Sequence, residues 1–327
     1  MKSLRLCFIF ILLFLPALLP AQWERCNGGT FGGISCLCQQ GTTLFGGFSD
    51  HNGPTIMAST DGGAHWSFSS NGVPHENITL LSSTDSTLYV GTIGLFASTD
   101  HGGNWHPAGM SGIYIRVLSM NKQHKFVTTG IPGYTGPVYR SNIGDTNWVK
   151  SDSTLKNPQI SALLATDGVI YLGTQEGGNP DGGPWYYGSV YRSTDEGDHW
   201  VRSDSGITSK QVIGLAIVDS VVIGATGKNS IVVSTNGGTS WKESAISQGT
   251  FNSFMVIGST IYSCTSKGVY ASLDHGVTWS AVPNLSGNVQ AFIAQDGDFV
   301  AGVNGWDVRH SSDAGGSWKT LNTMRID

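Results

Sequence analysis

The stretch STDEGDHW, from Ser193 to Trp200, indicates the fold because its pattern, S-x-D-x-G-x-x-W, returns along the whole chain. Four further full copies are STDGGAHW (59–66), STDHGGNW (98–105), SLDHGVTW (272–279) and SSDAGGSW (311–318). Two copies depart from the pattern: STNGGTSW (234–241) has Asn236 for Asp, and SNIGDTNW (141–148) has Ile143 for Asp and Asp145 for Gly. Successive terminal tryptophans are 39, 43, 52, 41, 38 and 39 residues apart. A period near forty residues is typical of propeller blades.

The residue types in this pattern suit a tight hairpin turn. Glycine adopts the positive φ that such a turn needs, and a short Asp or Asn side chain accepts hydrogen bonds from free backbone N–H groups. The Ser hydroxyl supports the same turn, and the Trp opens the next strand and covers apolar surface. We therefore predict a structural role for Asp61, Asp100, Asp195, Asn236, Asp274, Asp313, Trp66, Trp105, Trp148, Trp200, Trp241, Trp279 and Trp318.

The composition favours many short strands. The 327 residues include 45 Gly and 11 Pro, and only 13% are charged, which is typical of an all-β protein. Apolar segments ahead of each turn, such as ISALLATDGVIYLGT (160–174) and SVYRSTD (189–195), supply three strands, and the Trp opens a fourth. We predict a single seven-bladed β-propeller of four-stranded antiparallel blades over residues 22–327, with blades near 30–70, 76–109, 112–152, 157–206, 209–247, 250–284 and 287–322.

The sequence does not show which strands close the ring. The segment from Ser317 to Leu321 already supplies an outer strand for the last blade, and Trp23 to Cys26 is a candidate strand beside it.

Residues 1–21 have the features of a secretory signal peptide. Lys2 and Arg5 precede an apolar stretch from Leu6 to Leu19, and Ala21 is a small residue at the expected cleavage site. We therefore predict a secreted or periplasmic protein, with no later apolar run long enough to span a membrane.

The cysteines and the net charge limit which disulfides, cofactors and partners are expected. Cys36 and Cys38 are two apart on a predicted strand, so they share a face and are not expected to pair with each other; the pairing of Cys26 and Cys264 stays open, as do buried thiols. No C-x-x-C or H-E-x-x-H motif occurs, so no zinc site and no cofactor are predicted. A net charge of -5 without Lys/Arg clusters argues against a nucleic-acid partner.

The repeated turn is identified as the Asp box, also called the bacterial neuraminidase repeat. The chain resembles Asp-box β-propellers over essentially all of residues 22–327. That family includes sialidases, xyloglucan-cleaving hydrolases, sortilin-type receptors and photosystem II stability and assembly factors, so the resemblance implies a fold without selecting a function. The compact unit GTIGLFASTD (91–100) is most similar to the assembly-factor group. That similarity implies a non-enzymatic binding or scaffold module.

The alternative is a glycoside hydrolase, either sialidase-like or xyloglucanase-like. The resemblance to sialidases would require an Arg-Ile-Pro element, which is missing, and only Arg116 and Arg309 are placed to approach a central channel. Xyloglucan-cleaving enzymes carry two such propellers, and this chain has one. Glu176 and Asp307 are a candidate carboxylate pair for glycoside hydrolysis, although solvated loop carboxylates are the simpler interpretation. No G-x-S-x-G elbow supports a serine hydrolase.

Candidate binding residues lie in the connections between the second and third strands of a blade, whose lengths vary. The long connections are GFSDHNGPT (47–55), GIPGYTGP (130–137), QEGGNPDGGPWYYG (175–188) and NGWD (304–307). Their aromatic residues suggest a protein or glycan ligand, or they only pin the loops to the blades. The candidates are His51, Tyr134, Glu176, Asp181, Trp185, Tyr186, Tyr187, Trp306 and Asp307. Glu176, Asn179 and Asp181 match no standard calcium loop, so no metal site is predicted.

Overall fold

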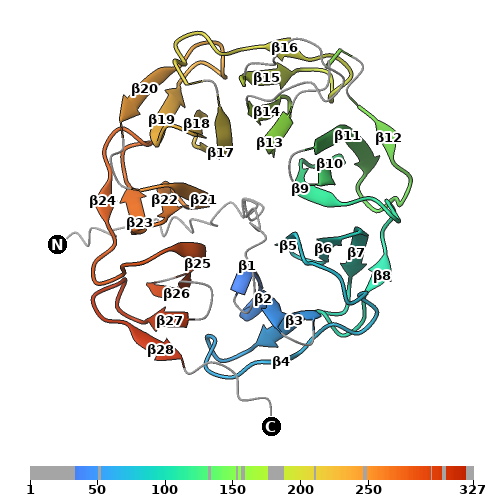
Figure 1. Cartoon of the computed structure of the whole chain (residues 1–327), viewed down its shortest axis with the longest axis vertical. Helices are drawn as coiled ribbons and strands as arrows, with labels where there is room; N and C mark the ends of the chain where they lie inside the picture. Colours follow the sequence, from blue (N-terminus) through green and yellow to red (C-terminus); the bar gives the residue numbers. More distant parts are fainter. Residues whose placement is uncertain are drawn as a thin grey trace, which may run out of the picture.

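A computed structural model describes residues 34–50, 53–131, 134–151, 154–155, 159–175, 188–209, 211–245, 249–295, 297–303 and 307–321. These residues form seven four-stranded antiparallel sheets, which stand around a central axis as the blades of a ring (Figure 1). This confirms the predicted seven-bladed, all-β propeller. The signal-peptide prediction, Cys26 and the possible closing strand at Trp23 lie outside the described residues. The described part of the chain holds no helix that is long and apolar enough to cross a membrane.

Each blade consists of four consecutive strands, with the first strand innermost (Figure 1). Blades 1 to 4 contain β1 (Ile34–Gln40), β2 (Thr43–Asp50), β3 (Gly53–Ser59), β4 (Ser67–Phe68); β5 (Leu80–Ser83), β6 (Leu88–Thr92), β7 (Gly94–Ser98), β8 (His106–Pro107); β9 (Ile115–Met120), β10 (His124–Ile131), β11 (Tyr134–Asn142), β12 (Val149–Lys150); and β13 (Gln159–Ala165), β14 (Ile170–Gln175), β15 (Val190–Ser193), β16 (Val201–Arg202). Blades 5 to 7 contain β17 (Val212–Val218), β18 (Val221–Thr226), β19 (Ser230–Ser234), β20 (Lys242–Ala245); β21 (Phe251–Ile257), β22 (Thr260–Thr265), β23 (Gly268–Ser272), β24 (Ser280–Ala281); and β25 (Val289–Gln295), β26 (Asp298–Val303), β27 (Asp307–Ser311), β28 (Lys319–Leu321).

The antiparallel order gives the ring two different faces. Consecutive antiparallel strands turn at alternate ends, so the turns between first and second strands and the S-x-D-x-G-x-x-W turns lie at one end of the blades. We call this end the turn face and the S-x-D-x-G-x-x-W segments the repeat turns. The connections between second and third strands, and those from one blade to the next, lie at the opposite end, which we call the loop face.

The repeat turns share one hydrogen-bond pattern. In blade 4, Ser193 Oγ donates to Asp195 Oδ1 at 2.7 Å and accepts from the Gly197 N–H at 2.8 Å. The same carboxylate oxygen accepts from the His199 N–H at 2.9 Å. These three bonds recur in blades 1, 2, 6 and 7, and in blade 5 the amide oxygen of Asn236 takes the place of the carboxylate. The Asp or Asn side chain therefore satisfies a backbone donor that the turn would otherwise leave unpaired.

Blade 3 lacks this pattern, and a buried lysine occupies the region. Lys125 on β10 is 2% exposed, and its Nζ donates to the carbonyl oxygen of Asp145 at 2.6 Å. The amine also lies 5.8 Å from the ring centre of Tyr89 and 5.5 Å from that of Trp148, within cation–π range. Lys125 thus stabilises a turn in which Ile143 replaces the capping carboxylate.

The tryptophans of the repeat turns connect neighbouring blades at the outer rim. The indole Nε1 of Trp105 donates to Ser69 O at 2.6 Å, and that of Trp241 donates to Ser203 O at 2.7 Å; both acceptors belong to the preceding blade. Trp148, Trp200 and Trp318 make equivalent bonds to Ala108 O, Ser151 O and Pro283 O. Trp66 and Trp279 instead bond to a glycine carbonyl in their own turn.

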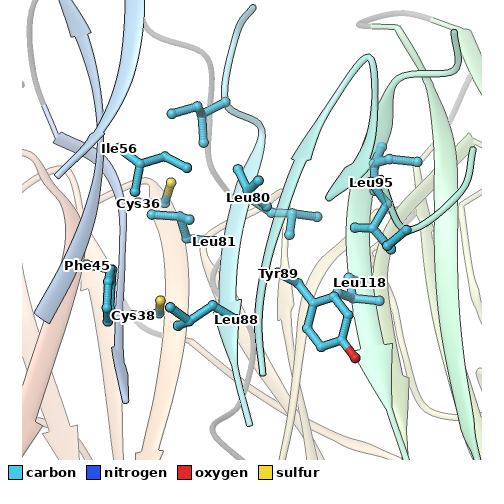
Figure 2. Close-up of a cluster of buried hydrophobic side chains, with 14 of the residues drawn as sticks. Cys36, Cys38, Phe45, Ile56, Leu80, Leu81, Leu88, Tyr89, Leu95 and Leu118 are labelled. Carbon is cyan, nitrogen blue, oxygen red and sulfur yellow. The ribbon is translucent and has the colours of Figure 1, made fainter. Parts of the chain in front are cut away.

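Between the blades the sheets pack through apolar side chains. Figure 2 shows one such layer, in which Phe45 and Ile56 of blade 1 lie opposite Leu81 and Leu88 of blade 2. Cys36 and Cys38, two residues apart on β1, both belong to this layer, whereas Cys264 lies in the core between blades 6 and 7.

The ring closes by the same kind of packing. Ile34, Leu37 and Leu44 of blade 1 form one buried cluster with Ile293 and Val300 of blade 7. In the described part of the chain, each sheet is built from consecutive strands of one segment. Apolar burial therefore joins blade 7 to blade 1.

Asn236 provides a natural control for the capping carboxylates. We expect Asp195→Asn to lower the free energy of unfolding at pH 7 by less than Asp195→Ala does, because an amide oxygen can accept the same backbone bond. We expect Asp195→Ala to lower it by about 1 kcal/mol, because the His199 N–H loses its acceptor. Urea denaturation of both variants checks this, and an Ala variant as stable as the Asn variant would contradict it.

The turn carboxylates also predict acid sensitivity. Backbone and side-chain hydrogen bonds from His65 and His199 lower the pKa values of Asp61 and Asp195 from 3.8 to about 2. A pKa that is lower in the folded state stabilises the fold above the unfolded pKa, and this contribution is lost as the pH falls through the folded value. We expect the free energy of unfolding to fall between about pH 4 and about pH 2.

The matched variant for this test is Asp61→Asn combined with Asp195→Asn. It should show a smaller fall over the same pH range in denaturation curves at a series of pH values. An unchanged fall would show that other groups cause the acid sensitivity.

Candidate functional site

A solvent-open hollow lies at the axis of the ring, between the innermost strands of blades 3 to 6. The volume that it encloses is small, about 40 Å³. Its lining combines the apolar residues Val117, Leu163, Ile213, Leu215, Phe251 and Phe254 with the polar residues Ser161, Asn252 and Ser253. Val117, Ile213 and Leu215 are only partly buried, so apolar surface is available to a ligand there.

Six of the seven innermost strands contain a β-bulge near their loop-face end. The register between first and second strands slips by one residue at Ser35, Arg116, Ser161, Ile213, Asn252 and Gln290. A bulge leaves one residue out of the ladder and re-aims its side chain. The side chains at these six positions therefore do not follow the regular alternation between the two faces of a strand.

Three side-chain hydrogen bonds near the loop-face ends of the inner strands join neighbouring blades. Ser161 Oγ donates to Val212 O at 2.6 Å and joins blade 4 to blade 5. Asn252 Nδ2 donates to Val289 O at 2.7 Å and joins blade 6 to blade 7. Thr79 Oγ1, just before β5, makes the corresponding bond from blade 2 to the carbonyl oxygen of Ile115 in blade 3.

Three complementary links lie on the turn face, where a side chain of the repeat turn reaches the preceding blade. His101 Nδ1 lies 2.9 Å from Gln40 Oε1, which joins blades 2 and 1. His275 Nε2 lies 2.9 Å from Asp219 Oδ2 and joins blades 6 and 5. Glu196 Oε2 accepts a bond from Asn121 Nδ2 at 3.0 Å and joins blades 4 and 3. The two sets together connect the blades in succession from 1 to 7, which fixes the inner strands around the hollow.

Arg116 is the single charged residue on the seven innermost strands. It is partly buried, and burial lowers the pKa of its guanidinium below the usual value with no charged or hydrogen-bonding group offsetting the effect. The other four arginines of the described chain have partners: Arg140 pairs with Asp198, Arg192 donates to Gly237 O, Arg202 pairs with Asp204, and Arg309 pairs with Asp307.

The structure separates the two arginines that the sequence placed near a channel. Arg116 lies on an innermost strand, β9, whereas Arg309 lies on β27, two strands farther from the axis. The guanidinium of Arg309 is 3.4 Å from the Asp307 carboxylate. The expectation that Arg309 approaches the channel is therefore wrong, because its side chain pairs on an outer part of blade 7.

Most of the predicted loop residues lie outside the described residues. These are His51, Glu176, Asp181, Trp185, Tyr186, Tyr187 and Trp306. Tyr134 begins β11 and Asp307 begins β27, so both backbone positions are on the loop face, in blades 3 and 7. The predicted aromatic rim and the candidate carboxylate pair of Glu176 and Asp307 stay predictions.

In the described part of the chain, no group of three or more His, Cys, Asp and Glu side chains could hold a metal ion. Asn179, considered with Glu176 and Asp181 for calcium, lies outside it.

Sequence reasoning missed the apolar hollow. Its signal is the run VIGLAIV on β17, in which apolar residues occupy consecutive positions and not alternate ones. Such a strand has apolar side chains on both faces, and here one face is turned to the hollow.

The fold places this protein in the class of seven-bladed β-propellers. A model of the DUF6242 beta propeller domain matches residues 221–327, which comprise β18 and all following strands. No curated protein matches the sequence.

Solved structures of other propellers resemble the chain at low sequence identity. YCF48 from Cyanidioschyzon merolae is 12% identical, with 92% of this chain and 89% of that chain covered and a TM-score of 0.56. A structure described as YCF48 bound to D1 peptide is 15% identical, with 77% and 82% covered and a TM-score of 0.53.

The extracellular domain of BT4673 from B. thetaiotaomicron, a putative one component system, is 14% identical with a TM-score of 0.65. The alignment covers 89% of this chain but only 40% of that domain. At these identities the similarity establishes the propeller fold alone.

Proposed function

We propose that this chain is an exported, non-enzymatic β-propeller that binds a protein ligand at its loop face. The observation that carries the proposal is the axial hollow, where Val117, Ile213 and Leu215 leave apolar surface partly exposed on otherwise well-packed inner strands. Largely apolar pockets with a few polar groups are the usual form of ligand sites. Exposed apolar surface is costly in water, and a bound ligand would cover it.

A protein ligand agrees with one of the structural neighbours. The YCF48 propeller was solved bound to a D1 peptide, so a ring of this architecture can hold a peptide. The partly exposed side chains of Val117, Ile213 and Leu215 offer apolar contacts to an amino-acid side chain. Both observations favour a peptide segment over a glycan as ligand.

Two further parts of the proposal come from the sequence. The S-x-D-x-G-x-x-W turns are proposed to be Asp boxes, and their capping bonds support a structural role for them. Residues 1–21, with Lys2 and Arg5 before an apolar stretch, are proposed to direct export. The ligand would then be an extracellular or periplasmic protein.

Filling the hollow should abolish binding. We expect Ile213→Trp to remove capture of the ligand from an extract of the native exported proteins, because the larger ring occupies the space between blades 3 and 6. Val201→Trp is the matched control, because Val201 is 63% exposed on the outer strand β16. Immobilised wild-type and variant proteins are compared by mass spectrometry of the retained proteins.

Melting curves accompany this comparison, because overpacking can destabilise a blade. The proposal predicts that wild type and Val201→Trp retain the same protein and that folded Ile213→Trp does not. Equal retention by a folded Ile213→Trp variant would contradict it.

A further inference from the structure

We propose that Arg116 is the anchor for a carboxylate group of the peptide ligand, held at the loop-face mouth of the axial hollow. The inference rests on the proposed function and adds the chemical class of the ligand. It concerns a peptide that offers a carboxylate, from an acidic side chain or its C-terminus, next to an apolar side chain.

The first argument is the position of Arg116 in blade 3. Val117 pairs with Thr128 and Ile115 with Thr129, so Arg116 is left out of the ladder between β9 and β10. Ile115 and Leu118 are buried, whereas the two adjacent residues Arg116 and Val117 are partly exposed. Val117 lines the hollow, and Arg116 directly precedes it, at the loop-face end of the same innermost strand.

The second argument is the missing partner. Burying a guanidinium without an acceptor is unfavourable, and proteins normally pair such groups. The four other described arginines follow this rule, two of them with more than one acceptor. Arg116 has five N–H donors and no acceptor within the described part of the chain. The guanidinium donors of Arg116 are therefore available to a ligand.

The third argument is charge complementarity. At the corresponding bulges the other blades carry Ser35, Ser161, Ile213, Asn252 and Gln290, all uncharged. One positive charge on an otherwise neutral inner wall, next to apolar surface, fits a single negative group attached to an apolar one. Arginine can hold a carboxylate by two parallel N–H···O bonds, which also orients the ligand.

The test uses two libraries of ten-residue peptides. One contains Asp and Glu and has free C-termini; the other lacks both residues and is amidated. Immobilised wild-type protein is exposed to each library, retained peptides are identified by mass spectrometry, and the Kd of the most enriched peptide is measured by calorimetry. We expect enrichment from the first library only, with apolar residues next to the carboxylate.

The decisive comparison is between Arg116→Gln and Arg202→Gln, the same substitution at a paired arginine on the outer strand β16. Arg116→Gln should weaken binding about tenfold or more, and Arg202→Gln should change it less than about twofold. The melting temperature of Arg116→Gln should equal or exceed that of the wild type, because no partner is lost. Amidating only the C-terminus of the best peptide distinguishes a terminal carboxylate from a side-chain carboxylate.

The outcomes separate the two proposals. Equal enrichment from both libraries, or equal Kd values for the two variants, would overturn the role of Arg116 and leave peptide binding standing. A lower melting temperature of Arg116→Gln, with affinity unchanged, would show that the residue is structural. No retention of any peptide by the wild type would overturn the proposed function together with the anchor.

Discussion

The hydrogen bond from a tryptophan indole to the preceding blade fixes five of the seven blade interfaces of this propeller at the rim. A four-stranded blade cannot bury both faces alone, so each must be held in register against its neighbours. Trp105, Trp148, Trp200, Trp241 and Trp318 provide this at the rim by pairing a side-chain donor with a backbone carbonyl of the adjacent blade. The capped repeat turns hold the tryptophans in place, because the Asp side chain accepts the N–H of the residue just before the Trp.

Much of the fold could be predicted because the repeat turn is a local structure. The Ser, Asp, Gly and Trp of one turn interact within eight residues, so their spacing alone reports the hairpin, and counting the turns reports the blades. Ring closure could not be predicted in this way. It depends on a buried apolar cluster that includes Ile34 and Leu37 of β1 and Ile293 of β25, which are far apart in the sequence and have no motif.

The candidate site was only partly predictable for the same reason. Arg116 is visible in the sequence as a charge within IYIRVLS, but its lack of a partner among the described residues follows from where their side chains lie. Arg309 looked equivalent and is paired with Asp307. The degenerate turn of blade 3 was evident in the sequence. Its support by Lys125 was not, because the lysine precedes Asp145 by 20 residues.

The hydrogen bonds and apolar contacts between blades imply that the ring unfolds as one unit. Such a ring is a rigid frame for a ligand at the axis. Hydrogen exchange of the backbone amides tests this most directly, by comparing β1 and β25 at the closure with β13 on the other side of the ring. If apolar packing closes the ring as firmly as the other interfaces, all three strands should exchange at the slow rate of global unfolding. Rapid exchange in β1 or β25, while β13 stays protected, would show that the ring opens at blades 7 and 1 and would contradict the account.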